Sequence, residues 1–339
     1  MAGSGSLRPW CLRSGGVAGL IASLLLSLGC QKAETPPVDG SSKPADTEAQ
    51  MGTTPPKEPG EAAANDAAFA PMVEVQEEDY AQARSRFQTK LTRKGPSPQE
   101  WARATPPAGV TEVEYASGKL RLKAWVNRPA DETRKHSAVL FLHGGFAFGL
   151  DDWEISQPYR AAGFVVLTPL LRGENGQAGA YSFYYDEVDD VLAAAEYLSK
   201  LPYVKADRLY IAGPSAGGTL VLLTAMASKR FRAATSFSGI TDQVLFCKHA
   251  KNAARDVPVD LTDLRELQLR SPLAYATSFK CPARIYYGTQ EPHLHGMSQR
   301  TAALAKRRGL NVEAIQVEGD HSTSVPLAIK QSIAFFQKN

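Results

Sequence analysis

From Val110 to the C-terminus, short apolar segments alternate with segments of helical periodicity, and this alternation restricts the fold more than any other feature. Strands are expected at 111–116, 120–127, 137–144, 164–170, 208–215, 233–239, 283–289 and 312–319, and helices at 186–200, 217–228, 299–308 and 325–337. Several strands are almost entirely apolar, as strands are when helices cover both faces of a sheet. Residues 110–339 therefore predict an α/β domain with a doubly wound, mostly parallel sheet that begins with an antiparallel hairpin.

The N-terminus has the composition of an export signal. Arg8 and Arg13 precede an uncharged, leucine-rich run that is shorter than the roughly 20 residues of a membrane span. Residues 1–29 therefore predict a signal peptide. The run ends in SLGC and resembles a bacterial lipoprotein signal, which implies a lipid anchor on Cys30 and a location in the cell envelope, on its periplasmic or outer-membrane face. Cleavage nearby, with secretion of a soluble protein, is the alternative.

Two further segments precede the domain. Residues 30–75 contain few large apolar side chains and predict a disordered tether, because they cannot bury enough surface to offset chain entropy. Residues 76–109 predict a helical segment, with Tyr80, Ala83, Phe87 and Leu91 at helical spacing.

The charges give no indication of a nucleic-acid partner, because 38 Lys and Arg are interspersed with 35 Asp and Glu. The sequence leaves the oligomeric state open.

A serine stands at the sharpest corner of the domain, in the sequence GPSAGG at 213–218. The motif follows a strand and opens a helix, which is the setting of a nucleophile elbow. In such a turn the hydroxyl group projects above the sheet, and the start of the helix faces the atom that it attacks. Ser215 is therefore the candidate nucleophile.

A serine nucleophile needs a base and an acid that orients the base. His321 follows the last expected strand, at the end of the sheet where Ser215 also lies, and is the candidate base. The loop after the preceding strand has one carboxylate, Glu291, which is the candidate acid. Asp320 is the alternative, although a residue adjacent to His321 would have difficulty folding back onto the ring.

The segment HGGF at 143–146 follows the first parallel strand and predicts an oxyanion hole. Its glycines let backbone amides face a reacting carbonyl group, so the amide of Gly145 or Phe146 would act together with that of Ala216. His143 is expected to support this loop by hydrogen bonding.

Together these segments resemble the catalytic domain of α/β-hydrolases of the prolyl-oligopeptidase type. The resemblance is carried by HGGF, GPSAGG, GDH at 319–321, LLRGENG at 170–176, DDVLAAAEYL at 189–198 and SPLAYA at 271–276. It implies Ser215 as nucleophile, His321 as base, and the amides of Ala216 and Gly145 as oxyanion donors. Two features depart from the family: Glu291 stands where aspartate is usual, and residues 76–109 are too few for the β-propeller that usually precedes the domain.

The expected function is that of a serine hydrolase which cleaves short peptides or carboxylic esters through an acyl-enzyme, without a metal or organic cofactor. Aromatic residues expected near the nucleophile favour an apolar or aromatic substrate group; they are Phe146, Phe148, Trp153, Tyr181, Phe183, Tyr184 and Tyr185. An acyltransferase with the same site and a non-catalytic tethered binding protein are the alternatives.

Residues 240–282 leave room for a small cap, and an oxidising envelope would permit a disulfide between Cys247 and Cys281.

Overall fold

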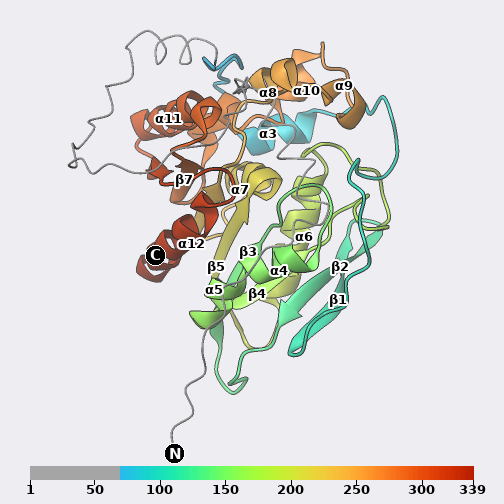
Figure 1. The fold of residues 1–339 in the computed structure, drawn as a ribbon, viewed down its shortest axis with the longest axis vertical. Helices are drawn as coiled ribbons and strands as arrows, with labels where there is room; N and C mark the ends of the chain where they lie inside the picture. Colours follow the sequence, from blue (N-terminus) through green and yellow to red (C-terminus); the bar gives the residue numbers. More distant parts are fainter. Residues whose placement is uncertain (1–68) are drawn as a thin grey trace, which may run out of the picture.

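The computed structural model describes residues 69–339, which form one eight-stranded sheet with helices on both faces (Figure 1). The strands are β1 (Val110–Ser117), β2 (Leu120–Asn127), β3 (His136–Phe141), β4 (Val165–Pro169), β5 (Val204–Pro214), β6 (Ala233–Phe237), β7 (Ala283–Gly288) and β8 (Val312–Val317). Each of them overlaps a strand that the sequence predicts. The signal peptide predicted at 1–29 and the anchor residue Cys30 lie outside the described residues.

The strand order in the sheet is β1-β2-β4-β3-β5-β6-β7-β8. β1 and β2 form an antiparallel hairpin, and β2 is also antiparallel to β4. The strands from β4 to β8 run parallel to one another. The predicted α/β-hydrolase fold, a mostly parallel sheet that starts with an antiparallel hairpin, is therefore confirmed.

Apolar side chains on the two faces of the sheet form two buried cores. One face is covered by α6 (Glu187–Ser199), α7 (Ser215–Ala227) and α11 (Pro292–Arg307), and the other by α4 (Leu150–Ile155), α5 (Gln157–Ala161) and α12 (Ser324–Lys338). The short helices α4 and α5 are not predicted, because one or two turns show too little periodicity to be recognised. In parallel sheets between two helical layers, ligands bind at the loops that follow the carboxyl ends of the strands.

Between β6 and β7 the chain forms a small cap of short helices (Figure 1). These are α8 (Gln243–His249), α9 (Ala253–Asp256), α10 (Leu264–Gln268) and the 3₁₀ helix η1 (Pro272–Ser278). The sequence predicts room for such a cap. It also permits a disulfide there, but Cys247 and Cys281 are both free thiols, so this pairing does not form in the structure.

The N-terminal part of the described chain packs against the domain. Helix α3 (Tyr80–Arg86) occupies only a small part of the helical segment predicted at 76–109, and it ends because the backbone turns extended at Phe87. The tether predicted at 30–75 ends earlier than expected: Val73 is buried, and the amides of Met72 and Val73 donate to the Asp242 carboxylate at 2.6 and 2.9 Å. Among residues 69–339, no helix has the length and apolar character needed to cross a bilayer.

Candidate active site

Ser215 lies where β5 meets α7, in a turn with left-handed backbone geometry. Its φ angle is 51°, which is strained for a residue with a side chain. The turn also brings two glycines against the end of β3. A Cβ atom on Gly213 would lie 2.6 Å from the Leu142 carbonyl oxygen, and one on Gly217 would lie 2.4 Å from that of His143. Only glycine fits at either position, so these residues form the elbow that the sequence predicts.

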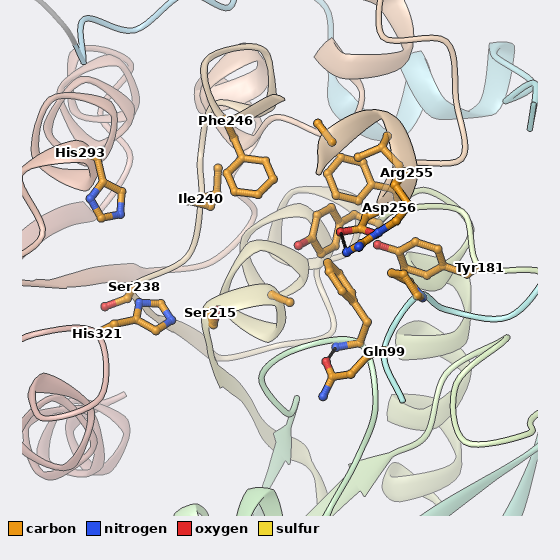
Figure 2. Close-up of a pocket in the computed structure, with 17 residues that line it drawn as sticks. Gln99, Tyr181, Ser215, Ser238, Ile240, Phe246, Arg255, Asp256, His293 and His321 are labelled. Atoms are coloured by element: carbon orange, nitrogen blue, oxygen red, sulfur yellow. Dashed lines mark hydrogen bonds and ion pairs between the residues drawn. The ribbon is translucent and has the colours of Figure 1, made fainter. Parts of the chain in front are cut away.

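His321 follows β8 and lines the same pocket as Ser215 (Figure 2). Its Nδ1 atom lies 2.7 Å from Oε1 of Glu291, and the other edge of the ring is directed toward Ser215 (Figure 2). No direct hydrogen bond joins Ser215 and His321 among the bonds of the described residues. A proton on Nδ1, donated to Glu291, leaves Nε2 as the basic atom that faces the serine.

Glu291 lies directly after β7, at the start of α11, and is only 2% exposed. Its second oxygen, Oε2, accepts a hydrogen bond from Ser238 Oγ at 2.5 Å and another from the Gly288 amide at 2.7 Å. Burial alone would raise the pKa of Glu291. The hydrogen bond and charge of His321, with the bonds from Ser238 and Gly288, outweigh burial and hold this pKa below its usual value.

Ser238 was not identified from the sequence. It lies in the turn after β6, has a φ angle of 52°, and is fully buried against the acid. The only signal in the sequence is its place near the C-terminal end of the strand expected at 233–239, at the same end of the sheet as Ser215.

Asp320, the alternative acid, forms no hydrogen bond with the ring among the described residues. Its carboxylate accepts hydrogen bonds from the amides of Ser322 and Thr323 and from the Thr323 hydroxyl, at 2.8 to 2.9 Å. It therefore holds the turn that leads into α12, while Glu291 contacts His321.

The loop at 143–146 passes beside the serine, and one of its amides is already engaged. The Phe146 amide donates to Oε1 of Gln99 at 2.8 Å, so it is not free to bind an oxyanion. The described residues provide no acceptor for the Gly145 amide. Ala216 lies in the first turn of α7, where an amide has no partner within the helix. Gly145 and Ala216 are thus the amides available to a substrate carbonyl.

His143 supports this loop from a buried position. Its Nε2 atom lies 3.0 Å from Oε2 of Glu174, and its Nδ1 atom lies 3.0 Å from the Gly144 carbonyl oxygen. Burial opposes a charge on this ring, but the Glu174 carboxylate outweighs burial and raises the pKa of His143 to about 9. Both ring nitrogens can then donate, which is the supporting arrangement that the sequence predicts.

The pocket in front of Ser215 is largely apolar (Figure 2). Four of the seven predicted aromatic residues line it: Phe146, Tyr181, Phe183 and Tyr184. The other three pack elsewhere, since Phe148 and Trp153 contact Trp125 and Tyr185 contacts Phe87. The sequence patterns do not predict the parts of the pocket wall that come from distant segments. They are Ile240, Phe246, Ala253 and Val257 around and within the cap, and Pro98 and Gln99 before the domain.

Few polar side chains face this pocket. His293 lines it from α11, and its buried Nε2 atom has no hydrogen-bond partner among the described residues. Burial lowers the pKa of this histidine and favours the neutral ring. Arg255 and Asp256 pair with each other at the pocket wall, at 2.7 Å. Within residues 69–339, no three His, Cys, Asp or Glu side chains are grouped as metal ligands.

Two curated relatives from Bacillus subtilis resemble this chain in sequence. The uncharacterized peptidase YtmA is 27% identical over 211 residues, which cover 60% of this chain and 79% of the relative. The uncharacterized peptidase YuxL is 25% identical over 202 residues, which cover 53% of this chain and 30% of the relative.

Solved structures show the same fold. A puromycin-hydrolyzing peptidase from Mycobacterium tuberculosis superposes with a TM-score of 0.61 and 24% identity, over 68% of this chain and 40% of its own. An esterase from Pyrobaculum calidifontis has a TM-score of 0.55 and 18% identity, over 69% of this chain and 86% of its own. The chain thus spans well under half the length of the peptidase structure.

The family comparison covers most of the catalytic domain. The model of the prolyl oligopeptidase family matches residues 151–338, a segment that contains the elbow, the acid and the histidine. The match is longer than half of the 339-residue chain. Since the fold, the order of these residues and the family model agree, the chain belongs to the prolyl oligopeptidase family.

Proposed function

We propose that this protein is a serine hydrolase that cleaves short peptides or carboxylic esters through an acyl-enzyme. One observation carries the proposal. His321 is bonded at 2.7 Å to the buried carboxylate of Glu291, at a pocket that Ser215 lines from a strained elbow. Strained backbone, a buried acid and a histidine in one pocket are features of catalysis rather than of stability.

In the first step, Ser215 Oγ attacks the substrate carbonyl carbon and His321 Nε2 removes the hydroxyl proton. The carbonyl oxygen becomes an oxyanion, which the amides of Gly145 and Ala216 stabilise. Each such donor is worth about 3 kcal/mol. Glu291 stabilises the imidazolium, which then protonates the leaving amine or alcohol. Water then attacks the acyl carbon and its proton passes to His321. The bond between this carbon and Ser215 Oγ breaks, His321 returns the proton to Oγ, and the carboxylic acid leaves.

The proposed substrate has an apolar or aromatic group next to the scissile bond. The aromatic wall of Phe146, Tyr181, Phe183 and Tyr184 supports this assignment, because it offers apolar area and few polar partners. Membership of a peptidase family supports peptides, and the esterase among the structural neighbours keeps esters within the proposal.

The acyltransferase alternative uses the same residues and differs only in the group that attacks the acyl-enzyme. The binding-protein alternative is disfavoured, because Ser215, Ala216 and His321 line one pocket and His321 is bonded to the buried Glu291.

A fluorophosphonate probe tests the proposal directly. The wild-type protein should be labelled, and Ser215→Ala should not. Parallel turnover of aminoacyl amides and aryl esters then ranks the two substrate classes. Absence of labelling on the folded wild-type protein would reject catalysis, and faster product formation with an added amine or alcohol acceptor would identify an acyltransferase.

We also propose that the protein is exported and held at a membrane by a lipid on Cys30. The apolar run that ends in SLGC supports this proposal. Cells that express the wild-type protein should incorporate labelled fatty acid into it, and Cys30→Ser should not. A wild-type protein that carries no label would exclude the anchor.

A further inference from the structure

A segment that precedes the catalytic domain holds the oxyanion loop. We call residues 87–101 the N-terminal arm. The arm fixes both backbone polar groups of Phe146: its amide donates to Gln99 Oε1 at 2.8 Å, and its carbonyl oxygen accepts from Ser97 Oγ at 2.5 Å. Gln99 also lines the pocket (Figure 2), whereas Ser97 is buried and does not line it.

The arm is itself fixed to the loops that surround the pocket. The Ser97 amide donates to the Gly173 carbonyl oxygen at 2.9 Å, and the Gly95 carbonyl oxygen accepts from the Tyr181 amide at 3.0 Å. Further back, the Arg93 side chain donates to the carbonyl oxygens of Ala254 and Arg255 in α9. The arm therefore offers Phe146 a rigid partner.

The contacts on either side of Gly145 explain why this support concerns catalysis. The Gly145 N–H belongs to the same peptide unit as the Gly144 carbonyl group. The oxygen of this carbonyl lies 3.0 Å from His143 Nδ1, which holds the unit in place. The next peptide unit carries the Phe146 amide, which Gln99 holds. Glycine rotates more freely than other residues, so its amide keeps one direction only when both neighbouring peptide units are held. The first is held within the loop and the second by the arm.

We propose that Gln99 and Ser97 are positioning residues for the oxyanion donor Gly145, and that residues 95–99 of the N-terminal arm are a functional part of the active site. The inference rests on the proposed hydrolase function. Gln99 also occupies the Phe146 amide, so that the loop presents the Gly145 amide alone to the substrate. Oxyanion donors act in the transition state, so their misalignment lowers kcat and has little effect on KM.

The experiment compares Gln99→Met with wild type. Methionine keeps the length of the side chain and removes the amide acceptor. The matched control is Gln88→Met, since Gln88 is exposed in the same arm and forms none of the bonds to Phe146. Steady-state kinetics on the preferred substrate and thermal unfolding are measured for each protein.

Removal of a complete donor costs about 10²–10³ in kcat, so we expect Gln99→Met to lower kcat by about 10- to 100-fold. KM should stay within about threefold and the control should match wild type.

Ser97→Ala is the second variant and should lower kcat in the same direction. If Gln99→Met does not fold, Ser97→Ala decides by the same criteria. The inference is overturned by an unchanged kcat, by a rise in KM alone, or by an equal loss in Gln88→Met. A wild-type protein that lacks turnover and fluorophosphonate labelling would instead overturn the proposed function, so the two failures are distinguishable.

Discussion

The two oxygens of the Glu291 carboxylate have different partners: Oε1 lies 2.7 Å from His321 Nδ1, while Oε2 accepts from Ser238 and the Gly288 amide. One oxygen thus orients the imidazole and the other fixes the acid itself. Because the carboxylate is buried and fully bonded, its orientation and its charge are both set by the fold.

Replacing the acid with its amide should abolish most of the activity. Glu291→Gln keeps the shape of the side chain and removes the charge that stabilises the imidazolium, so kcat should fall by about 10³–10⁴. Ser238→Ala keeps the carboxylate and removes one bond to it, so its loss should be under about tenfold. Steady-state kinetics on one substrate compares the two variants. A loss under tenfold in Glu291→Gln would assign the acid to another residue.

The family's usual acid should work poorly in this site. Glu291→Asp shortens the side chain by one methylene, so one carboxylate can no longer reach both His321 and Ser238 from the same backbone position. A displacement of about 1 Å in a catalytic group costs about 10²-fold in rate. We expect a fall of that order in kcat. An Asp variant as active as wild type would show that the loop after β7 adjusts freely to the length of the acid.

The His143–Glu174 pair predicts a loss of stability at alkaline pH. The folded-state pKa of His143 is about 9, against an ordinary value of 6.5, so the native state binds more protons than the unfolded state between these values. The stabilisation is complete below pH 6.5 and is lost as the pH rises through 9. It amounts to about 3 kcal/mol, because each pKa unit is worth about 1.4 kcal/mol.

Denaturant unfolding of the wild-type protein at several pH values measures this loss. In Glu174→Gln the carboxylate that raises the His143 pKa is absent, so the fall between pH 6.5 and 9 should disappear. The same fall in both proteins would trace it to other groups.

Two glycine substitutions should have opposite effects. In Gly217→Ala the new Cβ atom would lie 2.4 Å from the His143 carbonyl oxygen, so we expect a loss of about 1–3 kcal/mol and a large fall in activity. In Gly296→Ala, within α11, the nearest atoms lie at 3.5 Å or more, and the higher helix propensity of alanine should add about 0.5–1 kcal/mol. Thermal unfolding of both variants checks the signs. A stable, active Gly217→Ala would contradict the close approach.

The sequence predicts the features that depend on local patterns. Each expected strand overlaps one of the eight. Continuous apolar runs identify the buried parallel strands, and the short connection between 111–116 and 120–127 identifies the hairpin. Ser215, Glu291 and His321 can be named as candidates for one site because each follows a strand and the carboxyl ends of parallel strands meet at one edge.

The features that sequence reasoning missed depend on contacts between distant segments. Gln99 lies 47 positions before Phe146, and Ser238 lies 53 positions before Glu291. A lone glutamine or serine in a loop has no periodicity and no motif that would reveal its partner. Val73 shows the same limit, because the short apolar run at 70–73 has no periodicity that would predict docking.

The placement of Gln99 and Ser97 gives the two halves of the active site different resistance to partial unfolding. The acid and base are connected to the ends of β6, β7 and β8 in the sheet, whereas the Phe146 amide, next to Gly145, is bonded to an arm at the surface. Segments at the surface open at lower free energy than core strands. Mild denaturant should therefore abolish turnover while the sheet and the hydrogen bond between His321 and Glu291 are still intact.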